Sequence, residues 1–164
     1  MKKKIIKLSL LSSFLLSTNL NAMYAKKTGY KEITFSDGTI RKNGHRNWRN
    51  FNPGNIEYGK FAIKNGAIGT DGRFAIFQDM KSGYKAQVAL LSGKKYRNKS
   101  IKGAITKYAP KKENNTYRYI KVITKKLGVS KYKKLSSLSK KQLLKMVKVM
   151  SSHEGMKKGI VKKG

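Results

Sequence analysis

Several kinds of residue are scarce or absent in this chain of 164 residues. It has no cysteine, two prolines, one tryptophan, two histidines and seven acidic residues, against 39 lysines and arginines. The absence of cysteine excludes disulfide bonds, a lipoprotein anchor and a cysteine nucleophile. The histidines, His45 and His153, lie far apart and no HxxH or HExxH spacing occurs, so no metal site is predicted. The glycine-rich stretch 66–72 lacks a phosphate-loop signature, which argues against a nucleotide-dependent enzyme, and no cofactor is expected.

The sequence also lacks an apolar run of the about 20 residues that a membrane-spanning helix needs. Its apolar run, 8–20, is shorter, follows a lysine-rich start and is followed by the small residue Ala22. This layout is typical of a secretory signal peptide. We therefore predict a signal peptide over 1–22, with cleavage after Ala25 as a second choice and an uncleaved anchor as the alternative. The protein is expected to be periplasmic or secreted, without stable membrane insertion after cleavage.

Positive charge dominates the composition. The formal net charge is +32, and without the four lysines of residues 1–22 it is +28. A field of this size attracts polyanions. For an exported protein the expected partners are peptidoglycan or another anionic envelope polymer, or anionic lipid. Nucleic acid is the other general partner of basic proteins, but export argues against it.

The remaining chain divides by composition into a β-rich start and a longer helical part. We predict an N-terminal hairpin and linker over 23–45, a main domain over 46–159 and a frayed basic tail over 160–164. About 142 residues are enough for one modest core without disulfides or metal.

Strand patterns lie before residue 80. Aromatic and β-branched residues predict hairpin strands at 30–35 and 39–41 around a Ser-Asp-Gly turn. Segment 56–62 is predicted to be a short strand or an ordered loop, and the glycines of 66–72 predict a loop. The short apolar segment 73–77 predicts a strand that pairs with the start of 56–62.

Apolar residues recur at helical spacing from residue 80 on. Four helices are predicted, each with a cap or a stop: 80–91 before Gly93, 101–108 after Ser100, a helix between Asn114 or Asn115 and Gly128, and 140–152 after the capping box of Ser139 and Gln142. The predicted class is α+β, a small N-terminal β-hairpin or β lobe followed by a bundle of about four helices.

The stretch 48–56 is the most distinctive in the chain, because it combines the only tryptophan with an Asn-Pro-Gly-Asn turn. It is either a capped structural turn or a loop that holds polar side chains toward a ligand. Amide groups and aromatic rings suit sugars, so we predict that it lines a glycan-binding cleft. The predicted substrate-binding residues are Trp48, Asn52, Asn55, Tyr58, Tyr108 and Asn114.

A series of motifs around this loop resembles a known family. The motifs are Asn-Pro-Gly-Asn-Ile at 52–56, Gly-Ala-Ile-Gly at 66–69, Gly-Arg-Phe-Ala-Ile-Phe at 72–77, Gly-Tyr-Lys-Ala at 83–86, Tyr-Ala-Pro at 108–110, 113–120 and Glu-Gly at 154–155. In this order they are similar to phage virion and phage-derived proteins labelled as structural proteins of the P5 type. The resemblance covers about Arg46 to Gly155 and implies a lysozyme-like, peptidoglycan-directed domain. The chain departs from the family's pattern at Phe51 and Glu57.

Two glutamates are the candidate catalytic residues. Glu154 with Gly155 at the end of an apolar helix resembles the general-acid segment of phage-type lysozymes. The helix stands here after the β-rich part, the order that a circular permutation of a lysozyme fold would give. Glu113 lies at a predicted helix start, where the helix dipole favours an anion and hence a base or stabilising carboxylate. A general acid in so basic a chain would need an apolar, partly buried setting.

The leading hypothesis is therefore an exported lysozyme or lytic transglycosylase, acting as an effector or in wall remodelling. An effector would also have a cognate inhibitor protein as a partner. The alternatives are a cationic module that binds peptidoglycan or the envelope without catalysis, and a membrane-active toxin with amphipathic helices.

Overall fold

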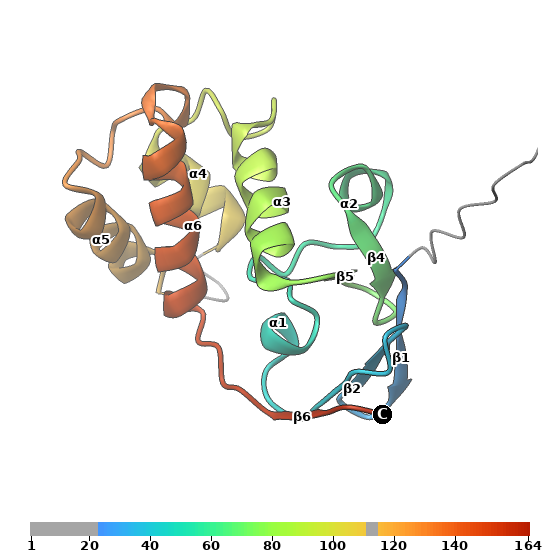
Figure 1. The fold of residues 1–164 in the computed structure, drawn as a ribbon. Coiled ribbons are helices and arrows are strands. Elements are labelled where there is room, and N and C mark those ends of the chain that lie inside the picture. The colour runs from blue at the N-terminus through green and yellow to red at the C-terminus, as the bar shows by residue number, and fades with distance from the viewer. Residues whose placement is uncertain (1–22, 111–114) are drawn as a thin grey trace, which may run out of the picture.

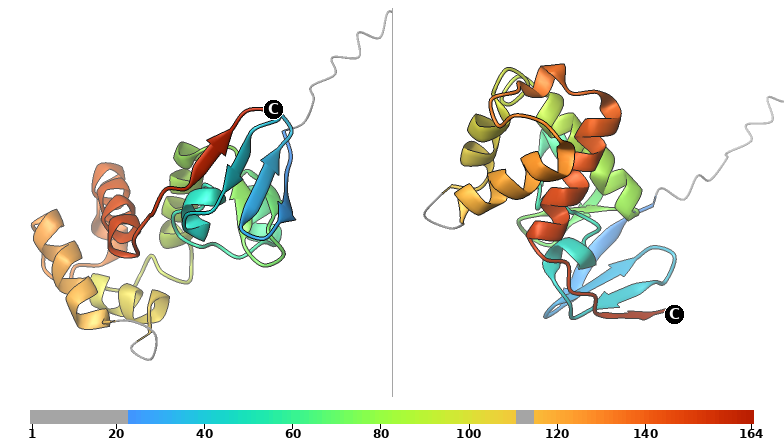
Figure 2. Two further views of the ribbon diagram at one scale, coloured as in Figure 1. Left: turned by 90° about the horizontal axis from the view of Figure 1, so that it is seen from below. Right: turned by 90° about the vertical axis from the view of Figure 1, so that its left-hand side faces the viewer.

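The computed structural model describes residues 23–110 and 115–164, so the predicted signal peptide lies outside the described residues. The protein has an α+β fold, as predicted: a mixed sheet lies at one end and the longer helices lie at the other (Figures 1 and 2). Its elements in chain order are β1 Ala25–Gly29, β2 Glu32–Phe35, β3 Ile40–Lys42, α1 Arg46–Arg49, α2 Lys60–Lys64, β4 Ala67–Thr70, β5 Ala75–Phe77, α3 Met80–Ser92, α4 Ile101–Tyr108, α5 Thr116–Leu127, the short 3₁₀ helix η1 Leu135–Ser137, α6 Lys140–His153 and β6 Ile160–Lys162.

The described sheet has the strand order β5-β4-β1-β2-β3-β6, in which β1 and β4 are parallel and every other neighbouring pair is antiparallel. The predicted hairpin is real, but it contains a further strand. The expected strand 30–35 is shortened to β2, and 25–29 forms β1, with Lys31 at φ 53° in the turn between them. β1 escapes the sequence pattern because Ala25 is its only buried residue.

The prediction of a loop over 66–72 is wrong, because Ala67–Thr70 forms β4. Its glycine explains both the misleading pattern and the strand. A Cβ atom on Gly69 would overlap the carbonyl oxygen of Ala25, so glycine permits the close parallel approach of β1 and β4. The strand predicted at 73–77 is confirmed as β5, and Ala75 N–H donates to the carbonyl of Ile56 at 2.9 Å, as expected. Segment 56–62 is a loop only in its first part, because its last three residues belong to the short helix α2, which was not predicted.

The prediction of a frayed tail is also wrong. Ile160–Lys162 forms β6 at the edge of the sheet and pairs with β3 (Figure 1). The end of the described chain therefore returns to the strands predicted as a separate N-terminal segment. The expected boundaries at 45/46 and 159/160 do not separate structural units, because one sheet crosses both.

The four long helices α3 to α6 agree closely with the sequence pattern. Their N-caps are Asp79, Ser100, Asn115 and Ser139, whose side chains each accept a backbone N–H, and Ser139 forms the predicted capping box with Gln142. α3 ends at Gly93, and α5 ends at Gly128, which is left-handed at φ 66°. The apolar faces of these helices form the largest hydrophobic cluster, which includes Ile105, Tyr119, Ile123, Met146 and Met150.

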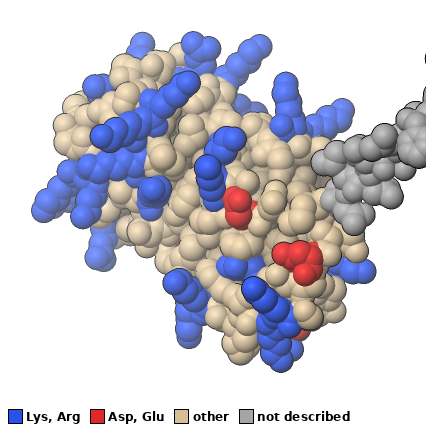
Figure 3. Space-filling model, in the orientation of Figure 1, with Lys and Arg blue, Asp and Glu red and all other residues tan. Residues whose placement is uncertain are grey.

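Lysine and arginine side chains are most dense over the helical end of the molecule and also stand over the sheet, and the few acidic side chains visible on the same face lie from its centre toward the sheet (Figure 3). Among the residues that the structure describes, no helix is long and apolar enough to cross a membrane.

Candidate active site

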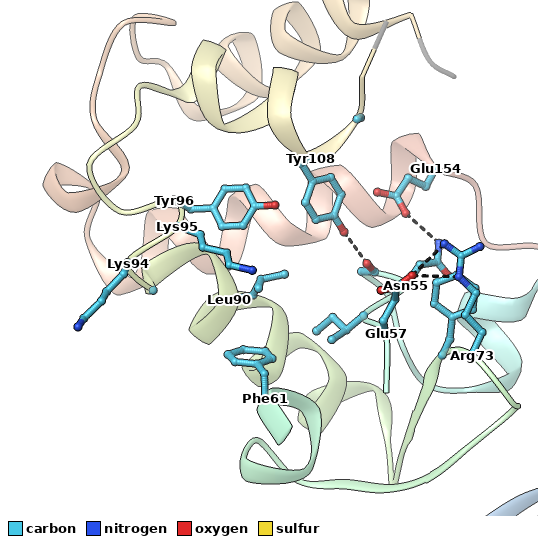
Figure 4. Close-up of a pocket in the computed structure, with 15 residues that line it drawn as sticks. Asn55, Glu57, Phe61, Arg73, Leu90, Lys94, Lys95, Tyr96, Tyr108 and Glu154 are labelled. Atoms are coloured by element: carbon cyan, nitrogen blue, oxygen red, sulfur yellow. Dashed lines mark hydrogen bonds and ion pairs between the residues drawn. The ribbon is translucent and has the colours of Figure 1, made fainter. Parts of the chain in front are cut away.

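A cleft of about 930 Å³ lies where the 54–57 loop, α3, α4 and the end of α6 meet (Figure 4). This volume is typical of small-ligand sites. The loop, Tyr108 and Glu154 face one another at one end, and Tyr96 and Lys95 lie toward the other. The residues that line it are Gly54, Asn55, Ile56, Glu57, Phe61, Arg73, Phe74, Leu90, Gly93, Lys94, Lys95, Tyr96, Tyr108, Ala109 and Glu154.

Glu154 is the C-cap of α6, and its carboxylate points toward the 54–57 loop. Tyr119 Oη donates to Glu154 Oε1 at 3.0 Å, and Asn55 Nδ2 donates to Oε2 at 3.4 Å. Burial raises the pKa of Glu154 to about 7, although both hydrogen bonds act in the opposite direction. The carboxyl group can therefore be protonated near neutral pH, despite the high positive charge of the chain.

Tyr119 holds this carboxyl group from the interior. Its side chain is only 1% exposed, and its ring stacks on that of His153 with centroids 4.2 Å apart. Burial, together with the nearby charge of Glu154, raises the pKa of Tyr119, so its hydroxyl remains a donor at neutral pH. Tyr119 was not a predicted site residue, because its apolar-face position in α5 indicates only a core role.

The loop opposite Glu154 is fixed by α3 and α4. Tyr108 Oη donates to the carbonyl of Gly54 at 2.6 Å and accepts from Gln87 Nε2 at 3.2 Å. Asn55 has φ 43°, a left-handed conformation that asparagine tolerates better than most residues. Of the predicted substrate-binding residues, the structure thus brings Asn55 and Tyr108 together at the cleft, although the Tyr108 hydroxyl is already engaged.

Three other predicted substrate-binding residues do not line the cleft. Asn52 is fully buried, and all its side-chain bonds go to backbone groups of the same lobe. Trp48 is 6% exposed, and its ring packs against the Arg41 guanidinium at 3.8 Å. Tyr58 is partly exposed but does not line the cleft. Asn52 and Trp48 therefore support the loop from within and do not line the cleft, in contrast to the substrate-binding roles predicted from sequence.

Glu113 and Asn114, predicted as a second catalytic residue and a substrate-binding residue, lie outside the described residues. Among those described, Glu57 is the other carboxylate that lines the cleft. Arg73 Nη2 and Nε both donate to Glu57 Oε1, at 2.9 and 3.0 Å. The departure from the family pattern at Glu57 was the only sequence signal for this position.

A further contact fixes the end of α6. Asn47 Nδ2 donates at 2.9 Å to the carbonyl of Gly155, which has φ 72°. The Glu154-Gly155 pair is thereby tied to α1 as well as to α5. Sequence spacing gave no sign of this bond, which joins residues 108 positions apart.

Comparisons of the sequence with protein-family models and with curated proteins gave no match. The described residues contain no group of three or more potential metal-ligating side chains.

Removing the hydroxyl of Tyr119 should raise the pKa of Glu154 further. In Tyr119→Phe the ring and the burial remain, but the carboxylate loses its shortest hydrogen bond. A hydrogen bond to a charged group is worth about 1.5 kcal/mol, which corresponds to about one pH unit. A ¹³C NMR titration of the Glu154 carboxyl group measures this. Tyr117→Phe, on the exposed face of α5, is the control and should leave the titration unchanged.

Glu154 should also make the protein less stable as pH rises from about 4.5 to about 7, because its pKa is raised above the ordinary 4.5 only in the folded state. The folded protein binds this proton more tightly than the unfolded protein does. The contribution of Glu154 to stability is therefore greatest below this window and constant above it. The loss is at most about 3 kcal/mol. Urea unfolding of wild type and Glu154→Gln across this range isolates the effect, which should vanish in the variant. The same dependence of unfolding free energy on pH in both proteins would contradict this prediction.

Proposed function

We propose that this protein cleaves peptidoglycan glycan strands, as a lysozyme or lytic transglycosylase, with Glu154 as the general acid. The observation that carries the proposal is a partly buried carboxyl group that Tyr119 and Asn55 hold at the wall of an open cleft, where burial raises its pKa to about 7. A general acid for glycosidic bonds needs this raised pKa, because it must arrive protonated and then lose its proton to the leaving oxygen. The predicted export, and the net charge of +28 outside residues 1–22, support an anionic wall polymer as the substrate.

In the proposed reaction, the protonated Oε of Glu154 gives its proton to the glycosidic oxygen as the bond from that oxygen to the anomeric carbon breaks. The same carboxylate then accepts a proton from the attacking group. If water attacks, the product is a hydrolysed sugar. If the 6-hydroxyl of the same sugar attacks, an internal ether forms and no water is consumed. The hydrogen bonds from Tyr119 and Asn55 stabilise the carboxylate left after the first step.

The setting of Glu57, the second described carboxylate of the cleft, favours the transglycosylase route, which needs only one acid–base residue. Glu57 is exposed, and Arg73 donates twice to its Oε1, so the adjacent positive charge would weaken this carboxylate as a nucleophile. A free, well-aligned carboxylate would be needed for either hydrolytic geometry. We therefore favour the transglycosylase form, in which Glu57 and Arg73 bind substrate polar groups.

Digestion of purified, lipid-free sacculi followed by mass spectrometry tests the proposal. A transglycosylase should release fragments without added water, whereas a lysozyme should release fragments that each carry one water more. If the sacculi bind the protein but yield no fragments, the protein is a non-catalytic cationic binding module. In that case binding should be lost at high salt, because exposed charge pairs are screened.

A further inference from the structure

An apolar groove of about 780 Å³ runs between α3 and α6, separate from the cleft. Its floor consists of aliphatic and aromatic side chains of both helices, and Leu144 within it is 40% exposed. The backbone groups beneath the floor are used within the helices, so an occupant finds few hydrogen-bond partners there. The floor residues are Met80, Tyr84, Val88, Ala89, Leu143 and Leu144.

The rim of this groove is cationic. Lys81 and Lys85 stand along the α3 side, and Lys140 and Lys148 along the α6 side, and all four are exposed. No acidic residue lines the groove. Lysine ammonium groups act as mobile point charges that suit a phosphate without demanding one fixed geometry.

We propose that this groove binds an acyl chain of an anionic phospholipid, with the lysine rim around its phosphate. An aliphatic chain needs no hydrogen bonds from the floor, and the negative charge of the phosphate complements the positive charge of the lysine rim. The groove volume lies within the range of small-ligand sites. The site would hold the protein at a membrane surface beside the wall, and it does not depend on the activity proposed for the cleft.

Charge argues against two other occupants. A second copy of this chain would bring its own net charge of +32 against the lysine rim. Residues 1–22 would bring an apolar run, but also four lysines. Like charges at close range are unfavourable in both cases.

The test is calorimetric titration of the full chain with lysophosphatidylglycerol, a single-chain anionic lipid, below its micelle-forming concentration. Lysophosphatidylcholine serves as the zwitterionic probe. Leu144→Asn should weaken anionic-lipid binding about tenfold, since it removes exposed apolar contact area and places an amide in the groove. Ile63→Asn, at an exposed apolar position away from the groove, should not change it. Far-ultraviolet circular dichroism verifies folding.

Two double variants separate the effect of the rim lysines on lipid binding from the effect of a lower net charge. Lys81→Gln with Lys85→Gln should weaken binding several-fold more than Lys26→Gln with Lys27→Gln, which lowers the net charge equally on exposed positions of β1. Residues 1–22 are identical in every variant, so they cannot produce these differences. Glu154→Gln should bind the lipid as wild type does, which keeps this test distinct from that of the proposed cleavage.

Several results would overturn the proposal. They are equal binding of the anionic and zwitterionic lipids, equal loss in both lysine pairs, no loss in Leu144→Asn, and self-association that Leu144→Asn abolishes in sedimentation. The last would assign the groove to a second copy. Tighter lipid binding after removal of residues 1–22 would likewise assign it to that segment.

Discussion

Glu154→Gln should reduce the release of soluble fragments from purified sacculi by at least about a hundredfold, the usual contribution of a positioned general acid. Glutamine keeps the size of the side chain, and its oxygen can still accept from Tyr119, but it has no transferable proton. Binding to sacculi should be unchanged, because the exposed lysines and arginines are all present. Fragment release and sacculus pull-down are measured on the same preparations.

Matched carboxylate variants show whether the loss is specific. Asp37→Asn changes an exposed turn residue far from the cleft and should retain full activity. Glu57→Gln should lower activity moderately if the Glu57–Arg73 pair binds substrate, and completely if Glu57 is a nucleophile. Glu113→Gln tests the rival predicted from sequence. Retained cleavage in Glu154→Gln, with loss in Glu113→Gln, would reject Glu154 as the acid and transfer the role to Glu113.

Local signals were readable from the sequence because the groups that interact are close together in the chain. The capping box of Ser139 and Gln142, the cap Ser100 and the stop Gly128 each act within a few residues. The four long helices α3 to α6 were therefore predicted nearly to their ends, whereas the short helices α1 and α2 were not predicted. The strands β1, β4 and β6 were missed because each depends on a distant partner, such as Ala25 beside Gly69. β6 is only three residues long and all three are exposed, so no alternation of buried and exposed positions marks it as a strand.

The same distinction explains the site. Glu154 was a sequence candidate because few acids exist and Glu-Gly follows a helix. Its raised pKa comes from burial, and its bonds come from Tyr119 and Asn55, residues 35 and 99 positions away. Trp48 and Asn52 were assigned to substrate because their residue types suit sugars. Residue type alone does not distinguish a ligand loop from the packing that supports one.

Asn52 illustrates that supporting role, and its removal should be the most destabilising change in the loop. Asn52→Ala should lower the free energy of unfolding by about 3 to 5 kcal/mol, within the range of a broken buried polar network. The amide Nδ2 donates to the carbonyls of Ile56 and Ala75, and Oδ1 accepts from the Ile56 N–H, all at 2.9 Å. Alanine leaves that N–H without its partner in the interior. Urea unfolding measures the loss.

The control is Asn98→Ala, at an exposed position, which should change stability by no more than about 0.5 kcal/mol. Asn52→Asp provides a sharper comparison, because aspartate keeps the acceptor but turns a carboxylate oxygen toward two carbonyl oxygens. It should destabilise at least as much as alanine, whereas a cost below about 1 kcal/mol in both variants would show that these bonds do not fix the loop. Because Asn55 opposes Glu154 from the same turn, variants at Asn52 that still fold should also lose cleavage activity. Such a loss of activity in folded variants would identify Asn52 as a residue that positions Asn55 across the cleft from Glu154.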